Sequence, residues 1–453
     1  MIEKTYIARG GANIELCDEE LDELFSGSIS KAVADLNNAG NVIVLPPDIT
    51  RFHSRAGYFT DLASRELKNR LTAVMPALGT HMAMTPKELS RMFPNTPKEK
   101  FLVHDWRNGI SELGRIEAEY VERICEGAVS YEWPCQVNNL LRNDNSGSGG
   151  FSLIISIGQV VPHEVAGMAN HAKNIFVGTG GKEAIDKSHF AGAAYGMERI
   201  MGYVNTPVRA LFDEGIRRFA DKLPPILWVL TVIGTRTEAE TTDKYSGSLV
   251  VRGLFIGFGR ECFEKAAKLA AEVNLDIIDE PIHKAVVYLD SEEYRTTWLG
   301  NKAIYRTRMA IADGGELLVL APGLERFGED IGADDLIRRY GYRPRSEIVS
   351  KIACDTVLKE NLGAAAHLIH GSSEGRFTVR YCPGDGITKK EIESVGYKWG
   401  DLDDALAVYD INKLKSGWNT LHDGERIFFV SNPALGLWAE KQRFLRENHA
   451  FNK

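Results

Sequence analysis

Short apolar segments rich in β-branched residues alternate with amphipathic segments along most of the chain. The apolar segments have the length and composition of buried strands, and they cover residues 41–45, 71–75, 151–157, 226–233, 248–257, 284–289 and 316–323. Helical periodicity predicts a helix over 261–273 and a long helix over 292–313. Such alternation is typical of α/β layers. We therefore predict two α/β domains with the active site in the cleft between them.

The pattern restarts after the strand that ends near residue 257. We expect an N-terminal cofactor-binding and catalytic domain over 1–258, completed by 425–453, where the strand-like piece 426–439 crosses back. The C-terminal domain, 259–424, is expected to close over the substrate. Ligands of open α/β sheets bind beyond the carboxyl ends of the strands, so the loops after these strands are where chemistry is expected.

Composition narrows the class of partner. The chain has 453 residues, is 44% hydrophobic and carries a net charge of -8 without a basic cluster, which argues against nucleic acid and favours a small molecule. Its longest apolar run, which starts at Ile226, is about half the ~20 residues of a membrane span, so we expect a cytoplasmic protein with no membrane partner. The six cysteines are scattered and are expected to be reduced thiols.

Two loops after N-terminal strands carry polar residues. In "VIVLPPDITRFHSR" two prolines stop the strand, and Asp48, Thr50, Arg51 and His53 follow. The guanidinium there is suited to a carboxylate, although an ordinary turn in which Asp48 caps the next helix explains the same residues. In "MPALGTHMAMTPKEL" the pattern T-P-K-E predicts a capping box, which places His81 in the loop before the helix.

The stretch "GQVVPHEVAGMANHAKNIFVGTGGKEAIDKSHF" combines three histidines with a lysine among small residues. The phosphate-loop pattern fails, because Phe176 and Glu183 stand where it needs Gly and Ser or Thr. His163 and His171 are too far apart for the i, i+4 pair of a helical metal site. A metal here would need ligands from a cofactor plus one or two side chains.

A fourth candidate lies in the predicted helix 292–313, where Arg295, Trp298 and Lys302 would share one face. The ordinary interpretation is a core tryptophan beside a surface lysine. If this face closes over the cleft, it supplies cations and an aromatic wall instead.

Taken together, these motifs resemble the lactate racemase family, whose members use a nickel-pincer nucleotide. The resemblance is carried by "DITR", by "ALGTH" followed by "MTPKEL", and by "PHEVAGMANHAK" with a histidine sixteen residues after its lysine. It continues through "WLGNKAIYRTRMAIADGGELLVLAPG" to "IFFVSNPALGLW", and so covers most of the chain.

The resemblance implies a role for each matching residue. Cofactor contacts are assigned to Lys173, as the covalent link, and to Asp48 and Thr50; the nickel ligand is His189. The catalytic histidines are His81 and His163, and the substrate contacts are Arg51, Lys302, Trp298 and Arg295. The chain departs from the family where "ANHAK" lacks a glycine pair before the lysine, where Trp298 replaces a tyrosine, and in "KENLGAAAHLIHG", which has no tryptophan.

The expected activity is racemisation or C2-epimerisation of a 2-hydroxy acid by hydride transfer to and from the nickel-pincer nucleotide, through a 2-keto acid. Two imidazoles suit this reaction, since one base is needed for each hydroxyl position of the two enantiomers. The substrate is a small acid such as lactate or malate, or a sugar acid; His53, Arg295 and Asn170 favour the larger, more polar class. The alternatives are a catalytically silent cofactor-binding homologue and a nicotinamide-dependent oxidoreductase. The oligomeric state and the role of His171 stay open.

Overall fold

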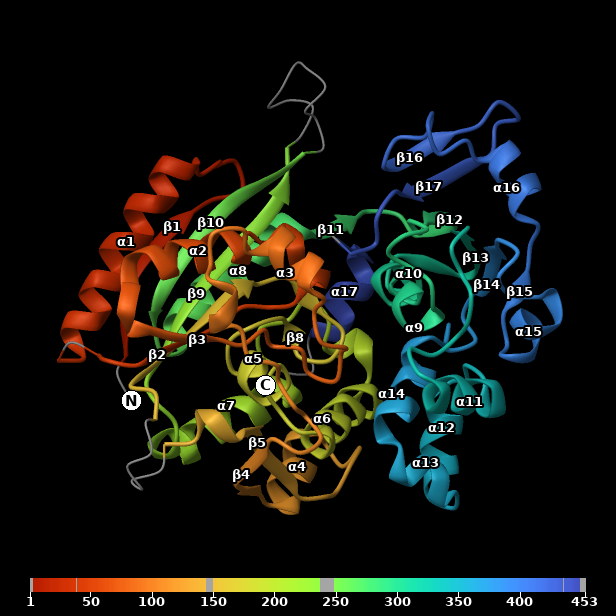
Figure 1. Ribbon diagram of the computed structural model, residues 1–453. Coiled ribbons are helices and arrows are strands. Elements are labelled where there is room, and N and C mark those ends of the chain that lie inside the picture. Colours follow the sequence, from red (N-terminus) through yellow and green to blue (C-terminus); the bar gives the residue numbers. More distant parts are fainter. Residues whose placement is uncertain (1–2, 38, 144–149, 237–247, 435, 449–453) are drawn as a thin grey trace. The chain divides into compact units, whose positions relative to one another are not determined.

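The computed structural model describes residues 3–37, 39–143, 150–236, 248–434 and 436–448, and it divides the chain into two compact units (Figure 1). The first unit comprises Met1–Ser188 and Gly202–Asn274, and the second comprises His189–Met201 and Leu275–Lys453. Each unit is built on one six-stranded sheet with helices against it. The predicted α/β fold is therefore confirmed.

The sheet of the first unit has the strand order β1-β10-β9-β6-β2-β3. Its strands are β1 (Lys4–Gly10), β2 (Val42–Leu45), β3 (Leu71–Val74), β6 (Leu153–Gln159), β9 (Ile226–Thr235) and β10 (Leu249–Phe258). The four strands from β9 to β3 are parallel, whereas β10 and β1 run antiparallel to their neighbours. The central strands are buried along nearly their whole length, which is why they appear in the sequence as continuous apolar runs.

Helices cover both faces of this sheet. One face packs on α1 (Asp18–Asp35) and α2 (Ala56–Leu67), where Phe25 and Phe59 contact each other with ring centroids 5.4 Å apart. The other face packs on α8 (Arg260–Asn274), which contacts β1, β9 and β10. Side chains of a strand alternate between faces, so Trp228 of β9 points toward α8 while its neighbours Leu227 and Val229 belong to the core under α1 and α2.

The remaining elements of the first unit lie in the connections between its strands. Five of them carry or support the candidate site: η1 (Ile49–Ser54), α3 (Pro86–Met92), β7 (Pro162–His163), β8 (Gly167–Met168) and α5 (Ala172–Phe176). The others are η2 (Lys68–Arg70), η3 (Lys98–Lys100), β4 (Ile110–Ile116), α4 (Ala118–Ile124), β5 (Trp133–Asn138), η4 (Asn139–Leu141), α7 (Pro207–Phe219) and η6 (Ala220–Lys222). Helix α6 (Lys182–Tyr195) begins in the first unit, and its last residues group with the second, as does η5 (Met197–Arg199).

The second unit has a sheet of order β15-β14-β13-β12-β17-β16, parallel except for the pair of β16 and β17. The strands are β12 (Ile282–Tyr288), β13 (Ile311–Ala321), β14 (Thr378–Pro383), β15 (Lys398–Trp399), β16 (Gly417–Thr420) and β17 (Arg426–Val430). A separate parallel pair joins β11 (Leu275–Ile278) to β18 (Leu437–Glu440). The helices are α9 (Thr297–Gly300), α10 (Lys302–Thr307), α11 (Ile331–Tyr340), α12 (Arg345–Ile352), α13 (Thr356–Glu360), α14 (Leu362–His370), α15 (Lys389–Ser394), α16 (Leu402–Val408) and α17 (Lys441–Asn448).

The two units differ from the predicted domains 1–258 and 259–424. Helix α8 groups with the first unit because its apolar face packs on β9 and β10, so the boundary falls after Asn274. The C-terminal segment 425–453 was expected to complete the N-terminal domain, but β17 pairs with β12 of the second sheet. Residues 189–201 also group with the second unit, although they lie far from it in the sequence.

The predicted long helix over 292–313 is wrong. The chain forms two short helices, α9 and α10, and then enters β13 at Ile311. Thr296 caps α9 by accepting a hydrogen bond from the amide of Leu299, so the helix starts five residues later than predicted. Gly300 ends α9 where the chain lies close to Leu289, a position with little room for a side chain. Arg295 consequently precedes the helices and does not share a helical face with Trp298 and Lys302.

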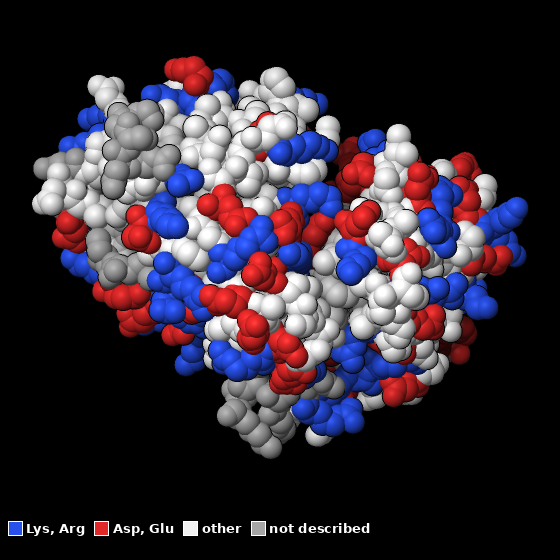
Figure 2. Space-filling model, turned by 90° about the horizontal axis from the view of Figure 1, so that it is seen from below, with Lys and Arg blue, Asp and Glu red and all other residues white. Residues whose placement is uncertain are grey.

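Acidic and basic side chains are interspersed on the face shown in Figure 2. Exposed ion pairs of the described residues include Lys265 with Glu261 at 2.9 Å and Arg426 with Glu280 at 2.5 Å. Exposed pairs of this kind each contribute about 1 kcal/mol or less to stability. Among the described residues, no helix has both the length and the apolar composition that crossing a membrane requires.

Candidate active site

The first element of the site is a carboxylate–imidazole pair formed by Asp48 and His81. Asp48 follows the two prolines that end β2, and its Oδ1 accepts a hydrogen bond from the amide of Thr50, which makes it the N-cap of η1. Its other oxygen, Oδ2, lies 2.6 Å from Nδ1 of His81. The capping interpretation is thus correct, and the same carboxylate also holds a histidine from the next loop.

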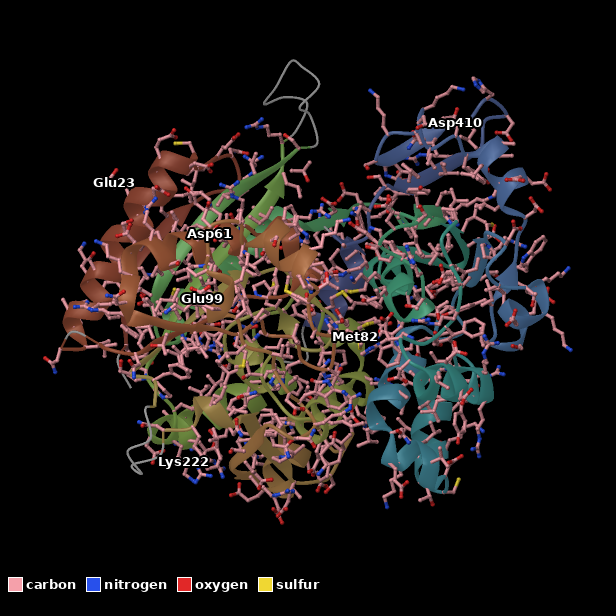
Figure 3. All side chains as sticks on the ribbon, in the orientation of Figure 1. Glu23, Asp61, Met82, Glu99, Lys222 and Asp410 are labelled. Atoms are coloured by element: carbon pink, nitrogen blue, oxygen red, sulfur yellow. The ribbon has the colours of Figure 1, made fainter. Side chains whose placement is uncertain are left out.

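The electrostatics of this pair favour an ionised carboxylate. Burial raises the pKa of Asp48, but the bonds from His81 and Thr50 outweigh it and hold that pKa below its ordinary value. An ionised Asp48 accepts the Nδ1–H of His81, so the lone pair of the neutral ring lies on Nε2. The His81 side chain is 51% exposed, and Met82 beside it is 88% exposed (Figure 3), so this nitrogen belongs to an open loop.

The predicted capping box fixes where that loop ends. Thr85 accepts a hydrogen bond from the amide of Glu88, and the Glu88 carboxylate accepts one from the amide of Thr85, at the start of α3. At its other end, the amide of Gly79 donates to the carbonyl of Gly178 at 2.9 Å, just after α5. The loop that carries His81 is therefore tied to the segment that carries Lys173.

Lys173 lies on α5, a short helix anchored to the last residue of β2 and to the middle of β6. The anchor is Asn174, whose amide group donates to Ser156 Oγ at 2.8 Å and to the carbonyl of Leu45 at 3.4 Å. Lys173 is partly buried, and this desolvation lowers its pKa to about 8. Arg51 adds to the effect. A lysine with this pKa is neutral in a substantial fraction of molecules near pH 8, and so is a competent amine nucleophile.

Four charged side chains lie close enough to Lys173 to shift its pKa. Arg51 and Arg209 lower its pKa, whereas Glu164 and Asp48 raise it. The structure thus brings Arg51, Asp48 and Lys173 together at the carboxyl edge of the first sheet, where ligands of α/β folds bind. Sequence reasoning missed Glu164 and Arg209; Glu164 directly follows His163, whereas nothing local distinguishes Arg209 from the neighbouring arginines of α7.

His163 is buried on β7, and its hydrogen bonding defines a tautomer. Its Nδ1 accepts a hydrogen bond from the amide of Val165 at 3.1 Å and lies 3.8 Å from a carboxylate oxygen of Glu164. The proton of the neutral ring is therefore on Nε2. In their neutral forms His81 therefore presents a lone pair at Nε2, whereas His163 presents an N–H at the same position.

The side chains of Thr50 and Asn170 form hydrogen bonds with other groups of the protein. The Thr50 hydroxyl donates to Asp48, so it supports the carboxylate predicted to border the cofactor. Asn170 is 8% exposed, and its side-chain oxygen accepts a hydrogen bond from the amide of His171. The preference of Asn170 for a larger substrate stays a prediction. His53 lines a groove of about 630 Å³ beside α1 and β10.

The other four predicted residues belong to the second unit. His189 is partly buried on α6, and the Arg295 side chain is 63% exposed and lies 3.9 Å from Glu325. Lys302 has its ammonium nitrogen 5.6 Å from the centroid of the Tyr294 ring. Trp298 stacks on His367, with centroids 4.1 Å apart and an interplanar angle of 24°.

His367 was not among the predicted site residues, although "AHLIH" in an apolar helix is a visible signal. Its Nε2 lies 3.0 Å from the hydroxyl of Tyr342, which is 2.7 Å from Oγ1 of Thr297. The ring that contacts Trp298 is thus fixed by two further side chains of the same unit.

Protein-derived metal ligands do not cluster in the part of the chain that the structure describes, where no group of three or more His, Cys, Asp or Glu side chains could hold an ion. All six cysteines are free thiols, as predicted; Cys17 and Cys354 are exposed and the other four are buried. Burial raises the pKa of Cys125, Cys262 and Cys382 to about 12, so these groups stay protonated.

One family model and two solved structures are similar to this chain. Residues 12–199 match the family model described as lactate racemase N-terminal domain. A crystal structure of a protein from Thermotoga maritima is similar, with 23% identity, a TM-score of 0.76, and coverage of 96% of this chain and 100% of that one. The lactate racemase apoprotein from Thermoanaerobacterium thermosaccharolyticum is similar at 15% identity and a TM-score of 0.64, over 96% of this chain and 94% of that one. No curated protein matches.

The family match spans Asp48, Arg51, His81, His163, Lys173 and His189, and both structural matches extend over nearly the whole chain. The motif-based resemblance is thereby confirmed: residues 12–199 match the lactate racemase N-terminal domain, and the fold of the chain is similar to that of a lactate racemase.

Proposed function

We propose that the protein is a racemase or C2-epimerase of 2-hydroxy acids that uses a nickel-pincer nucleotide linked to Lys173. The observation that carries the proposal is the partly buried Lys173, with its pKa of about 8, among Arg51, Asp48 and Glu164 in a lactate racemase domain. A lysine with only a structural role on a surface helix would keep its amine in solvent, whereas the amine of Lys173 is desolvated.

The residues fit the proposed cofactor. A neutral amine at Lys173 is suited to an amide-type bond with a thioacid group, and the imidazole of His189 is a suitable donor for Ni(II). When bound, the nickel-pincer nucleotide supplies an acceptor and donor of hydride for C2 of the substrate. Lys173 and Asp48 would hold it at the carboxyl edge of the first sheet.

In this proposal, side chains of the protein transfer the hydroxyl proton of the substrate and bind its carboxylate. His81, oriented by Asp48, would accept the substrate hydroxyl proton at Nε2, and His163 would hydrogen-bond the substrate oxygen through its Nε2–H. For His163 to act as the base in the reverse direction, its proton must move to Nδ1 and the Val165 amide must release that nitrogen. Arg51 would bind the substrate carboxylate through a bidentate pair.

We further propose that Lys302, Trp298 and Arg295 contact the substrate from the second unit. Lys302 would contribute a second cation for the carboxylate, and Trp298, fixed by His367, an apolar wall. Within the 2-hydroxy acids, we expect either a small acid such as lactate or malate or a sugar acid to be turned over.

Substitution of Lys173 tests the proposal. In Lys173→Ala we expect no covalent adduct on the peptide containing residue 173, loss of bound nickel and loss of epimerisation. The matched control is Lys182→Ala, an exposed lysine of α6 paired with Asp186, which should behave like the wild type. Adduct mass and nickel content are measured on protein loaded with the cofactor. Retention of both by Lys173→Ala would refute the tether.

The substrate is tested with a panel of 2-hydroxy and sugar acids in D2O, followed by NMR. Epimerisation with retention of the C2 hydrogen supports internal hydride return, whereas deuterium at C2 indicates deprotonation and contradicts the proposed route. Cofactor binding without turnover of any panel member would identify a catalytically silent homologue. Consumption of NAD in proportion to substrate would identify a nicotinamide-dependent oxidoreductase.

A further inference from the structure

Two consecutive residues before α5 adopt left-handed backbone conformations without being glycine. Asn170 has φ 70° and His171 has φ 58°, in the stretch where the sequence lacks a glycine pair. Side chains other than glycine rarely adopt this conformation, and two in a row need support from their surroundings. Lys173 follows this segment by two residues, so the backbone conformation of Met168–His171 determines where the lysine is placed.

The buried guanidinium of Arg209 provides a contact of this kind. Arg209 lies in the first turn of α7 and is fully buried, and its Nη2 donates to the carbonyls of Met168 at 2.6 Å and of Asn170 at 3.2 Å. Its guanidinium carbon lies 4.4 Å from the centroid of the Phe263 ring. A charged side chain is thus buried in order to hold two backbone carbonyls of this one segment.

His171 completes the support from the other side. It is 4% exposed and lies against Trp228 and Phe263, with ring centroids 4.2 Å and 5.0 Å away. Burial, together with Arg209 and Arg260, holds the pKa of His171 well below its ordinary value, so the ring packs as a neutral aromatic group. His171 is therefore part of the core that supports the segment.

We propose that Arg209 is a positioning residue for Lys173: by holding the carbonyls of Met168 and Asn170 it fixes the left-handed segment that starts α5 and presents the lysine. This inference rests on the proposed function only in taking Lys173 as the tether. The same guanidinium contributes to the low pKa of Lys173, so position and reactivity of the amine depend on one side chain.

The test uses cofactor-free protein and two readouts. The first is hydrogen exchange of backbone amides in the peptide covering 168–177, where Asn174 donates to the carbonyl of His171. The second is the pH midpoint of acylation of Lys173, measured by peptide mass spectrometry. In Arg209→Met we expect faster exchange in this peptide and a midpoint raised above about 8, which makes Lys173 less reactive at pH 7.

The matched control is Arg252→Met. Arg252 is also buried, but its guanidinium donates to the carbonyls of Ile14 and Thr235, outside the segment 168–177. This variant should lose a comparable amount of stability while leaving both readouts at Lys173 unchanged. A folded Arg209→Met with wild-type exchange and midpoint would overturn the proposal, and so would a raised midpoint with unchanged exchange, because charge alone explains it.

If Arg209→Met does not fold, Arg209→Lys carries the same two readouts, because it keeps the charge and loses the planar guanidinium. Faster exchange in residues 168–177 supports positioning, and wild-type exchange overturns it. The result is independent of the tether, which is judged by the adduct in Lys173→Ala. Retention of the adduct there refutes the proposed function, whatever Arg209 does to the segment.

Discussion

Replacing Lys173 by Met should stabilise the cofactor-free protein near neutral pH. The pKa of Lys173 is lowered to about 8 in the fold, against an ordinary value of 10.5. A difference of this size corresponds to about 3 kcal/mol of unfavourable free energy for the protonated group, reduced to about 2 kcal/mol for the solvent that the partly buried side chain retains. Met has a similar length and no charge, so the variant removes this term with little change in packing.

The sign of the pH dependence follows from which state holds the proton more tightly. Between about pH 8 and 10.5 the unfolded chain binds the Lys173 proton and the folded protein does not, so the stability contributed by this group rises with pH across that interval. Lys173→Met should therefore exceed the wild type by about 2 kcal/mol at pH 7 and by much less at pH 10.

Differential scanning calorimetry at pH 7, 8.5 and 10 measures this difference. A gain of about 2 kcal/mol raises Tm by several degrees for a unit of this size. Lys182→Met, on an exposed helix position, should leave Tm nearly unchanged at all three values. Equal stability of Lys173→Met and wild type at pH 7, or a gain that persists to pH 10, would show that Lys173 is not desolvated as described.

Three further predictions concern the same region. Asp48→Asn should lower kcat roughly 100-fold or more with little change in Tm, because the bond that orients the base is altered; steady-state kinetics beside a thermal melt measure both, and an unchanged kcat would exclude His81 as the oriented base. Nitrogen-15 NMR of the histidine rings should find neutral His163 protonated at Nε2, and protonation at Nδ1 would contradict the bond from Val165. Thr85→Ala should destabilise the protein by about 1 kcal/mol in chemical denaturation through loss of the cap, whereas Thr85→Ser should be nearly neutral.

The sequence was most informative where local chemistry decides the structure. The buried strands follow from their apolar runs, and the capping box at Thr85 follows from the residue types at its ends. The loops with Asp48 and His81 were located because prolines and caps bound them. Periodicity, however, did not show where the predicted helix 292–313 is interrupted: α9 ends at Gly300, α10 begins at Lys302, and the chain enters β13 at Ile311.

The features of the site that the sequence did not predict depend on contacts between segments that are distant in the chain. The pairing of Asp48 with His81 spans 33 residues, and the bonds from Arg209 to Met168 and Asn170 span about 40. His171 was ambiguous in the sequence because its neighbours in space, Trp228 and Phe263, come from a strand and a helix much further along the chain. No local pattern carries such information.

The distribution of thiols makes the protein suited to distance spectroscopy. Cys17 in the first unit and Cys354 in the second are exposed, whereas the other four cysteines are buried. A thiol-directed spin label should therefore attach once to each unit of the unmodified chain. Pulsed dipolar measurements between the two labels would then record the separation of the units, and its change when a ligand is added, without any engineered cysteine.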